Sequence, residues 1–304
     1  MPNKATLDIH GRKVNVTNLD KVFYPKTGFT KGQIIDYYVR ISPVLLPHLK
    51  NRAISLKRYP DGVEGFFFYE KNAPSHRPPW IKTTSVPKSD GTSINYCVMN
   101  DLPALVWAAN LADLELHTFL HSAPALQRPT CLAFDLDPGA PADILTCGKV
   151  GLLIQTLFAR LGLESFPKTS GSKGLQVYVP LNTSAATYEK TKAFALAVAH
   201  KLEQDHPALV VSKMQKSLRS GKVLVDWSQN DDKKTTVNVY SLRAREQPTV
   251  STPVTWKEVE IALKKKNPAL LTFDSRQVLE RVEKHGDLFA EVLTLKQKLP
   301  VASL

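Results

Sequence analysis

Apolar residues recur at helical spacing in some stretches of the chain and alternate with polar residues in others. Apolar side chains three and four positions apart predict helices over residues 31–49, 142–161 and 188–205, and Thr30 stands where an N-cap is expected. We expect a short buried helix over residues 102–111. We also expect a helical tail from residue 255 onward, interrupted at Asn267-Pro268.

Strand patterns lie between these helices. Residues 5–25 are typical of a short hairpin that turns at His10-Gly11-Arg12 and then enters a loop. Further strands are expected within residues 53–60, 66–72, 90–100, 111–121, 131–139, 164–181, 222–229 and 235–244. Because strands and helices interleave, the sequence predicts one α/β or α+β domain over residues 1–304.

The charge balance indicates the class of partner. The chain has 40 Lys and Arg against 28 Asp and Glu, a formal net charge of +12. Such an excess favours a polyanion, because each phosphate that a Lys or Arg neutralises releases condensed counterions. From charge alone, a merely basic enzyme is an equally good interpretation.

Cysteine usage and apolar runs point to the compartment. The three cysteines form no CxxC pair, so neither a disulfide framework nor a zinc site is expected. Since no signal peptide and no bilayer-long apolar run are present, we expect a soluble cytoplasmic protein.

Two acids end the apolar strand over residues 131–139. Residues two apart on a strand point to the same face, so Asp135 and Asp137 project together. Two carboxylates this close repel one another unless a cation lies between them, and oxygen ligands suit Mg²⁺ or Mn²⁺. Carboxylates that merely cap a loop are the commoner explanation of such a pair.

Asp226 strengthens the metal interpretation. It ends the apolar run at residues 222–225, where an acid serves no packing purpose. A third carboxylate beside Asp135 and Asp137 is what two-metal phosphoryl transfer needs. The alternative is that Asp226 caps a turn over Trp227.

A turn of small residues, Thr169 to Gly174, connects two predicted strands. Its backbone N–H groups and hydroxyls can approach an anion, and Lys173 supplies charge. It lacks the P-loop spacing, and by itself a flexible turn explains it equally well. Next to three carboxylates, a triphosphate cradle is the better interpretation.

These stretches together resemble the polymerase domain of non-homologous end-joining ligases (ligase D) of bacteria and archaea, in the archaeo-eukaryotic primase superfamily. The resemblance lies in NLDKVFYP, SLKRYPDGVEG, LVWAANLADLELH, FDLDPG, TSGSKGLQVYVPL and SLRSGKVLVDWSQN, in that order along the chain. It implies a primase-polymerase fold, with mixed sheets that form a catalytic cleft flanked by helices. It also implies an N-terminal module over about residues 1–120 and a catalytic module over about residues 121–304.

The resemblance assigns roles to residues one by one. It implies that Asp135, Asp137 and Asp226 bind two Mn²⁺ or Mg²⁺ ions and are catalytic. The nucleotide, an NTP or dNTP, would be bound by His117, Ser170, Lys173, Arg219 and Arg243. DNA would be bound by Lys57, by the aromatic residues Phe68 and Tyr69, and by a 5′-phosphate pocket of Asn18, Lys21 and Lys31.

The implied activity is template-directed nucleotidyl transfer to 3′ ends at gaps and double-strand breaks, with ribonucleotides preferred. The implied partners are DNA, Ku and a DNA ligase, and the implied location is the nucleoid. Two alternatives stay open: primer synthesis by a primase, and a non-catalytic module that binds DNA ends. The 5′-phosphate pocket favours repair over priming. Backbone N–H groups at the start of the helix over residues 31–49 are expected to help hold that phosphate.

Two stretches depart from the family pattern. Residues 117–131 differ from the usual tryptophan-bearing version, and residues 237–244 replace a more common sequence. Both departures lie outside the three acids.

Overall fold

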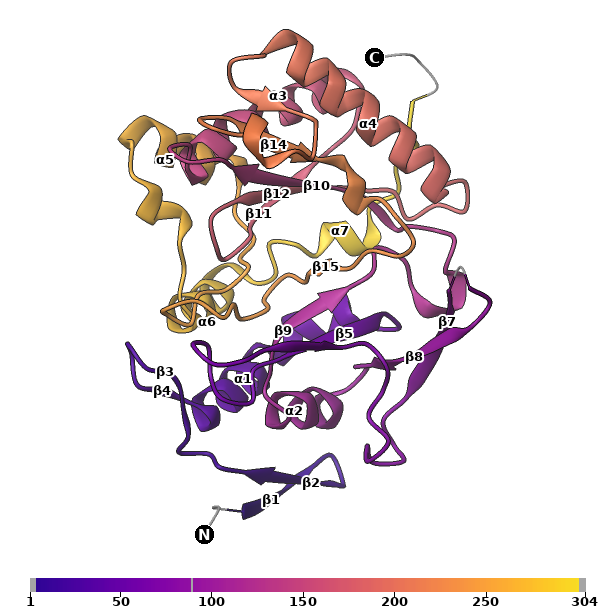
Figure 1. Cartoon of the computed structure of the whole chain (residues 1–304), viewed down its shortest axis with the longest axis vertical. Helices are drawn as coiled ribbons and strands as arrows, with labels where there is room; N and C mark the ends of the chain where they lie inside the picture. The colour runs from indigo at the N-terminus through magenta and orange to yellow at the C-terminus, as the bar shows by residue number, and fades with distance from the viewer. Residues whose placement is uncertain (1–3, 89, 301–304) are drawn as a thin grey trace. The chain divides into compact units, whose positions relative to one another are not determined.

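The computed structural model describes residues 4–88 and 90–300 of the chain (Figure 1). The chain divides into two compact units, each assembled from separate segments. The first unit holds the residues up to Pro124, Thr235–Val250 and Asp274–Gly286. The second holds Ala125–Lys234, Ser251–Phe273 and the residues from Asp287 onward. The sequence predicts modules that are continuous stretches, whereas each of these units combines distant segments.

The first unit is built on a six-stranded antiparallel sheet. The order is β15-β9-β5-β8-β7, and β6 also pairs with β5. Strand β5 is central, because β9 pairs along one edge while β8 and β6 share the other. The strands are β5 (Ala53–Arg58), β6 (Phe68–Glu70), β7 (Thr83–Pro87), β8 (Ser93–Val98), β9 (Asp113–Thr118) and β15 (Thr236–Val237).

Helices and two small hairpins complete this unit. Helix α1 (Lys31–Leu49) begins at Thr30, whose hydroxyl accepts from the Gln33 N–H in a capping box. Its apolar side chains recur at helical spacing and are buried, so the predicted helix and cap are confirmed. The other elements are α2 (Leu102–Asn110), α6 (Ser275–His285), the hairpin β1 (Lys4–Ile9) with β2 (Arg12–Thr17), and β3 (Val22–Tyr24) with β4 (Phe29–Thr30).

The second unit is built on a five-stranded sheet in the order β11-β12-β10-β14-β13. All its pairings are antiparallel except that of β13 with β14. The strands are β10 (Cys131–Pro138), β11 (Phe166–Thr169), β12 (Leu175–Pro180), β13 (Val210–Val211) and β14 (Val223–Asp226).

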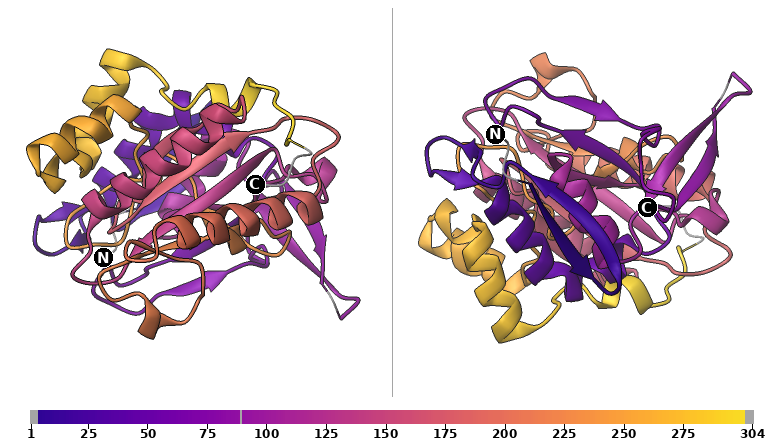
Figure 2. Two further views of the ribbon diagram at one scale, coloured as in Figure 1. Left: turned by 90° about the horizontal axis from the view of Figure 1, so that it is seen from above. Right: turned by 90° about the horizontal axis from the view of Figure 1, so that it is seen from below.

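Two long helices cover one face of this sheet. Helices α3 (Ile144–Arg160) and α4 (Tyr188–Asp205) lie over the strands in Figure 2, left. Leu132, Phe134 and Leu136 of β10 belong to the core that these helices close, and the Phe134 ring lies 5.7 Å from the Phe158 ring of α3. The alternate residues of β10, including Asp135 and Asp137, therefore point to the other face.

The C-terminal tail differs from its prediction. Helix α5 (Trp256–Lys265) is present, but residues 275–299 do not form one helix. Helix α6 ends at His285, because Gly286 adopts a left-handed φ of 67° and the chain leaves the helical path there. Only the short α7 (Glu291–Thr294) follows, and residues 295–300 are not helical.

Some strands also differ from the sequence prediction. The aromatic stretch 66–72 forms a strand only over β6. The extended stretch 235–244 forms a strand only over β15, with an isolated bridge from Leu242 to Val250, and β7 is not predicted by the sequence. Cys97, Cys131 and Cys147 are buried free thiols. No helix within residues 4–88 and 90–300 is long and apolar enough to cross a membrane. The mixed α+β class is confirmed.

His121 makes the stability of the first unit sensitive to pH. Its side chain is fully buried, and its ring stacks on Phe119 at 4.8 Å. Burial, with a smaller contribution from the Arg52 charge, lowers the pKa of His121 from 6.5 to about 4. The unfolded chain therefore takes up a proton on this residue at a pH at which the folded chain does not.

We predict that His121 destabilises the fold as the pH falls from about 6.5 to about 4, by an eventual total of about 3 kcal/mol. His121→Asn removes this dependence. Chemical denaturation of both proteins at several pH values measures the difference. If the two unfolding free energies stay parallel across that range, His121 does not carry the effect.

Candidate active site

The three predicted acids lie on one face of the five-stranded sheet. Asp135 of β10 stands directly opposite Asp226 of β14 in the antiparallel register, and Asp137 follows Asp135 by two residues. Directly opposed residues of neighbouring strands point to the same side of a sheet. The register thus brings the three acids together, on the face opposite α3 and α4.

The row of polar residues continues across the sheet beyond the acids. Gln176 of β12 stands opposite Asp135, and Lys168 of β11 stands opposite Gln176. Lys168 is fully buried; its ammonium donates to the Ser251 hydroxyl at 2.7 Å and lies 5.5 Å from the Tyr178 ring. A buried cation thus faces the row of carboxylates along the sheet.

Protein groups already contact the acids. Asp226 accepts hydrogen bonds from the Ser228 N–H at 2.8 Å and from the Gln229 amide at 3.1 Å. Asp137 pairs with Arg219 at 3.3 Å. Asp226 therefore does cap the turn that contains Trp227, as the alternative interpretation held, and it still stands beside Asp135.

The electrostatics of the acids favour a cation. Burial, then the charges of Asp137 and Asp226, raise the pKa of Asp135 to about 6. Within residues 4–88 and 90–300, no group of three or more His, Cys, Asp or Glu side chains is already arranged to hold a metal ion. The donors are nevertheless carboxylate oxygens that repel one another, and this donor set fits a hard divalent cation.

The predicted anion cradle is an ordered turn that adjoins β10. The Ser170 hydroxyl, nearly buried, accepts hydrogen bonds from the N–H groups of Ser172 at 3.2 Å and Gly174 at 3.1 Å. Gly174 lies so close to β10 that a Cβ there would overlap the Leu136 carbonyl. Ser170 shapes the turn, and Lys173 is exposed at its tip.

Arg219 lies beside the acids. Besides pairing with Asp137, its guanidinium donates to the Met214 carbonyl at 2.6 Å. Gly139, at the end of β10, approaches the Arg219 backbone so closely that any side chain would overlap it. The loop that carries Arg219 is thus held against the end of β10.

A second cluster, in the first unit, brings together three further predicted residues. Lys57 of β5, His117 of β9 and Arg243 all contact the carboxylate of Glu115. Their side chains are 12–13% exposed, so each keeps a small accessible surface. The sequence indicates Glu115 only as an acid on the same strand face as His117, and its central place is not predicted.

Aromatic rings border this cluster. The Lys57 ammonium lies 4.8 Å from the Phe67 ring and 5.6 Å from the Tyr69 ring. Tyr69 is half exposed, whereas Phe68 is partly covered and lies over Arg58. Phe66 and Phe67 are also exposed, at 71% and 47%. The exposed rings thus include Phe66 and Phe67, to which the resemblance to the ligase D family assigns no role.

The structure brings Asn18, Lys21 and Lys31 together at the start of α1. The Lys21 N–H donates to the Asn18 carbonyl at 3.0 Å, and the Lys31 N–H donates to the Lys21 carbonyl at 2.9 Å. Lys31 is 5% exposed, and burial lowers its pKa to about 8, helped by the Lys21 and Arg58 charges. The Lys21 ammonium contacts Asp61 at 3.1 Å.

One expectation about this helix start is wrong. The first N–H groups of α1 do not point to an open anion site, because those of Lys31 and Gly32 donate to loop carbonyls and that of Gln33 donates to Thr30. A phosphate here would have to be held by side chains.

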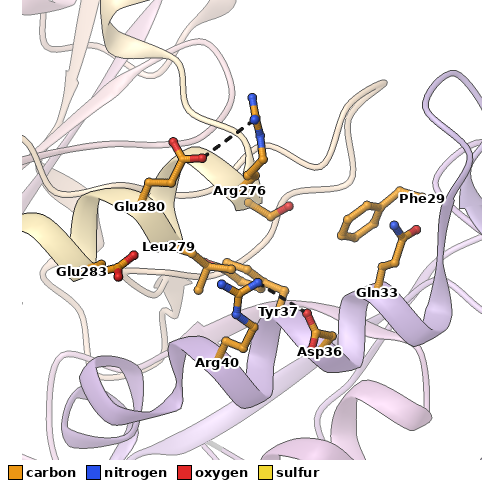
Figure 3. Close-up of a pocket in the computed structure, with 10 residues that line it drawn as sticks. Phe29, Gln33, Asp36, Tyr37, Arg40, Arg276, Leu279, Glu280 and Glu283 are labelled. Atoms are coloured by element: carbon orange, nitrogen blue, oxygen red, sulfur yellow. Dashed lines mark ion pairs between the residues drawn. The ribbon is translucent and has the colours of Figure 1, made fainter.

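A pocket of about 240 Å³ lies between α1 and α6 (Figure 3). Its charged residues pair within their own helices, Arg40 with Asp36 at 3.9 Å and Arg276 with Glu280 at 3.8 Å. Of the described residues that line it, none belongs to the predicted site. The pocket therefore adds nothing to the candidate active site.

Comparison with known proteins identifies the family. Residues 30–289 match the model of the LigD primase-polymerase domain. The chain is 42% identical over 289 residues to the multifunctional non-homologous end joining DNA repair protein LigD of Mycobacterium tuberculosis, and 34% identical over 292 residues to the bifunctional non-homologous end joining protein LigD of Bacillus subtilis. These alignments cover 91% and 96% of this chain, but only 36% and 46% of those relatives.

A solved structure agrees. The polymerase domain of M. tuberculosis ligase D, in complex with DNA, superposes with a TM-score of 0.86 at 40% identity. The match covers 93% of this chain and 99% of that one. The chain belongs to the LigD primase-polymerase family and is by that membership a polymerase domain, a nucleotidyltransferase of the class that uses divalent metal ions and nucleoside triphosphates.

Proposed function

We propose that this chain adds nucleotides, preferably ribonucleotides, to 3′ ends at gaps and double-strand breaks of DNA during non-homologous end joining. The observation that carries the proposal is the group of three acids on one sheet face beside the Ser170–Gly174 turn. A DNA complex of the similar M. tuberculosis polymerase domain supports DNA as the partner. We further propose Ku and a DNA ligase as partners and the nucleoid as location.

Each group of residues has a proposed role that follows from its chemistry. Asp135, Asp137 and Asp226 would hold Mn²⁺ or Mg²⁺, two ions in all. Metal ions held there would supply activation of the 3′-hydroxyl and stabilisation of the charge on the departing pyrophosphate. Lys173 binds phosphate oxygens, and Arg243 and Lys57, through the small accessible surface that each keeps, bind further parts of the nucleotide or the DNA. The exposed rings near Tyr69 stack on template bases.

Arg219 competes with any cation for Asp137. Its guanidinium partly neutralises that carboxylate at 3.3 Å. Its remaining N–H donors would bind triphosphate oxygens.

We expect Asp137→Asn to lower nucleotide addition to a primer by about two to three orders of magnitude, the usual cost of losing a group that stabilises charge in the transition state. Asp137 is suited to this test because its side chain is exposed and pairs with Arg219, whereas Asp226 also holds a turn. Primer extension with Mn²⁺ and with Mg²⁺ measures the effect.

The matched control is Asp205→Asn, which removes a surface carboxylate of α4 paired with Lys201. This variant keeps full activity, and both variants keep their affinity for DNA, since Lys and Arg make the phosphate contacts. Extension by Asp137→Asn at the wild-type rate would overturn the metal assignment.

Sugar preference is tested by competition between ATP and dATP opposite template thymidine. A site that hydrogen-bonds the 2′-hydroxyl leaves a polar group unpaired with dATP, so we expect ATP to be favoured about tenfold or more. Equal incorporation of the two nucleotides contradicts the proposed preference.

The 5′-phosphate pocket separates end joining from priming, since a primase has no downstream end to bind. We predict that removing the downstream 5′-phosphate weakens binding to gapped DNA by about 1–3 kcal/mol, the range for charge-assisted hydrogen bonds. The difference shrinks as the pH rises above about 8, because Lys31 then loses its charge in the free protein.

Fluorescence titration of phosphorylated and unphosphorylated gaps measures this difference, and the double variant Lys21→Ala, Lys31→Ala abolishes it. Extension of a simple primer-template by that variant is the control and stays near wild type. Equal binding of the two gaps by the wild-type protein would instead favour the primase alternative.

A further inference from the structure

Glu115 is the centre of a buried ionic cluster in the first unit. Its side chain is 2% exposed and lies on β9. One carboxylate oxygen contacts the Lys57 ammonium at 3.2 Å and His117 Nε2 at 3.0 Å. The other accepts from the Ala244 N–H at 3.0 Å and lies 3.3 Å from Arg243 Nε.

A carboxylate in this position is not explained by packing. Burying a charge is costly unless the charge is paired and hydrogen-bonded, and an apolar residue would fill the same volume without that cost. Burial alone would raise the pKa of Glu115, but the hydrogen bond from His117 and the charges of Arg243 and Lys57 hold it well below its ordinary value. Glu115 is therefore an anion throughout the physiological range.

This anion allows two cations to lie close together. Lys57 stands directly opposite Glu115 in the pairing of β5 with β9, whereas Arg243 comes from the distant segment Thr235–Val250. Burial lowers the pKa of Lys57, and so do the charges of Arg243 and Arg245, while Glu115 opposes these effects. Without Glu115, Lys57 and Arg243 would repel one another and separate.

Glu115 also decides the protonation of His117. An ionised carboxylate can only accept hydrogen bonds, so the Nε2 atom of His117 must carry the proton that it donates. Burial lowers the pKa of His117, and Glu115 opposes this shift. The neutral ring therefore has Nδ1 as its acceptor, which suits a hydroxyl or N–H of a ligand and not a phosphate oxygen.

We propose that Glu115 is a positioning residue of the nucleotide site. It holds Lys57 and Arg243 as a pair of phosphate-binding cations and fixes His117 in the Nε2–H tautomer, so that His117 accepts a hydrogen bond from the sugar or base of the incoming nucleotide. This inference rests on the proposed nucleotide contacts of Lys57, His117 and Arg243. It attributes the orientation of these side chains to the buried carboxylate of Glu115.

Glu115→Gln tests the proposal, because it keeps the shape of the side chain and removes the charge. Asp101→Asn is the matched control: Asp101 pairs with Arg12 at 2.7 Å in the same unit, and asparagine also caps a helix well, so α2 keeps its N-cap. The measurements are the pKa of His117, from NMR titration of its imidazole resonances, and kcat and KM for ATP in primer extension. The His117 resonances are assigned by their loss in His117→Gln.

We expect Glu115→Gln to lower the pKa of His117 and to raise KM for ATP at least about tenfold, with a smaller effect on kcat, because the lost contacts act on the bound nucleotide. Asp101→Asn changes neither quantity. A Glu115→Gln protein that folds with an unchanged His117 pKa, or with an unchanged KM for ATP, overturns the proposal.

Glu115→Asp keeps the charge but shortens the side chain, so it decides the matter if Glu115→Gln does not fold. One carboxylate can then no longer reach Lys57, His117 and Arg243 together, and KM for ATP rises although His117 still has an anionic neighbour. An unchanged KM in this variant also overturns the proposal. If the wild-type chain adds no nucleotide at all, the proposed function fails, and the His117 titration still decides whether Glu115 controls that ring.

Discussion

The packing of one face of β10 against α3 and α4 fixes the position of Asp135 and Asp137. Leu132, Phe134 and Leu136 fill that core, and the strand period of two then sends Asp135 and Asp137 to the other side. A register slip of one residue would turn the acids into the core and the apolar residues out of it. Burial of the apolar residues of β10 thus determines which way the acids point, although those apolar residues are not part of the polar site.

The two units manage buried charge in opposite ways. In the first unit, the carboxylate of Glu115 contacts Lys57, His117 and Arg243, so its buried charge is paired within the protein. In the second unit, carboxylates face one another, and burial together with the charges of Asp137 and Asp226 raises the pKa of Asp135. The first arrangement is suited to hold donors rigidly for an anion, and the second to attract cations.

The sequence predicts local features well and long-range contacts poorly. Helices α1 and α4 match their predicted bounds, because their apolar spacing and threonine caps are local signals. The broken tail is mispredicted because the helical pattern continues past Gly286 while the backbone does not. The acids at the ends of β10 and β14 are recognisable, since a carboxylate that ends an apolar strand is conspicuous. Glu115 contacts Arg243, which lies 128 positions later in the chain. Tertiary folding produces this contact, and the spacing of residues along the sequence does not predict it.

The composition of the first unit has a consequence for synthesis on the ribosome. The segment Thr235–Val250 supplies two contacts to earlier residues: β15 pairs with β9, and Arg243 pairs with Glu115. The segment Asp274–Gly286 supplies α6, which packs against α1. The N-terminal segment of the chain therefore emerges with an open edge on β9 and with Glu115 still lacking its contact with Arg243. The first unit is complete only once translation has reached Gly286, and until then its open sheet edge is available for incorrect pairing.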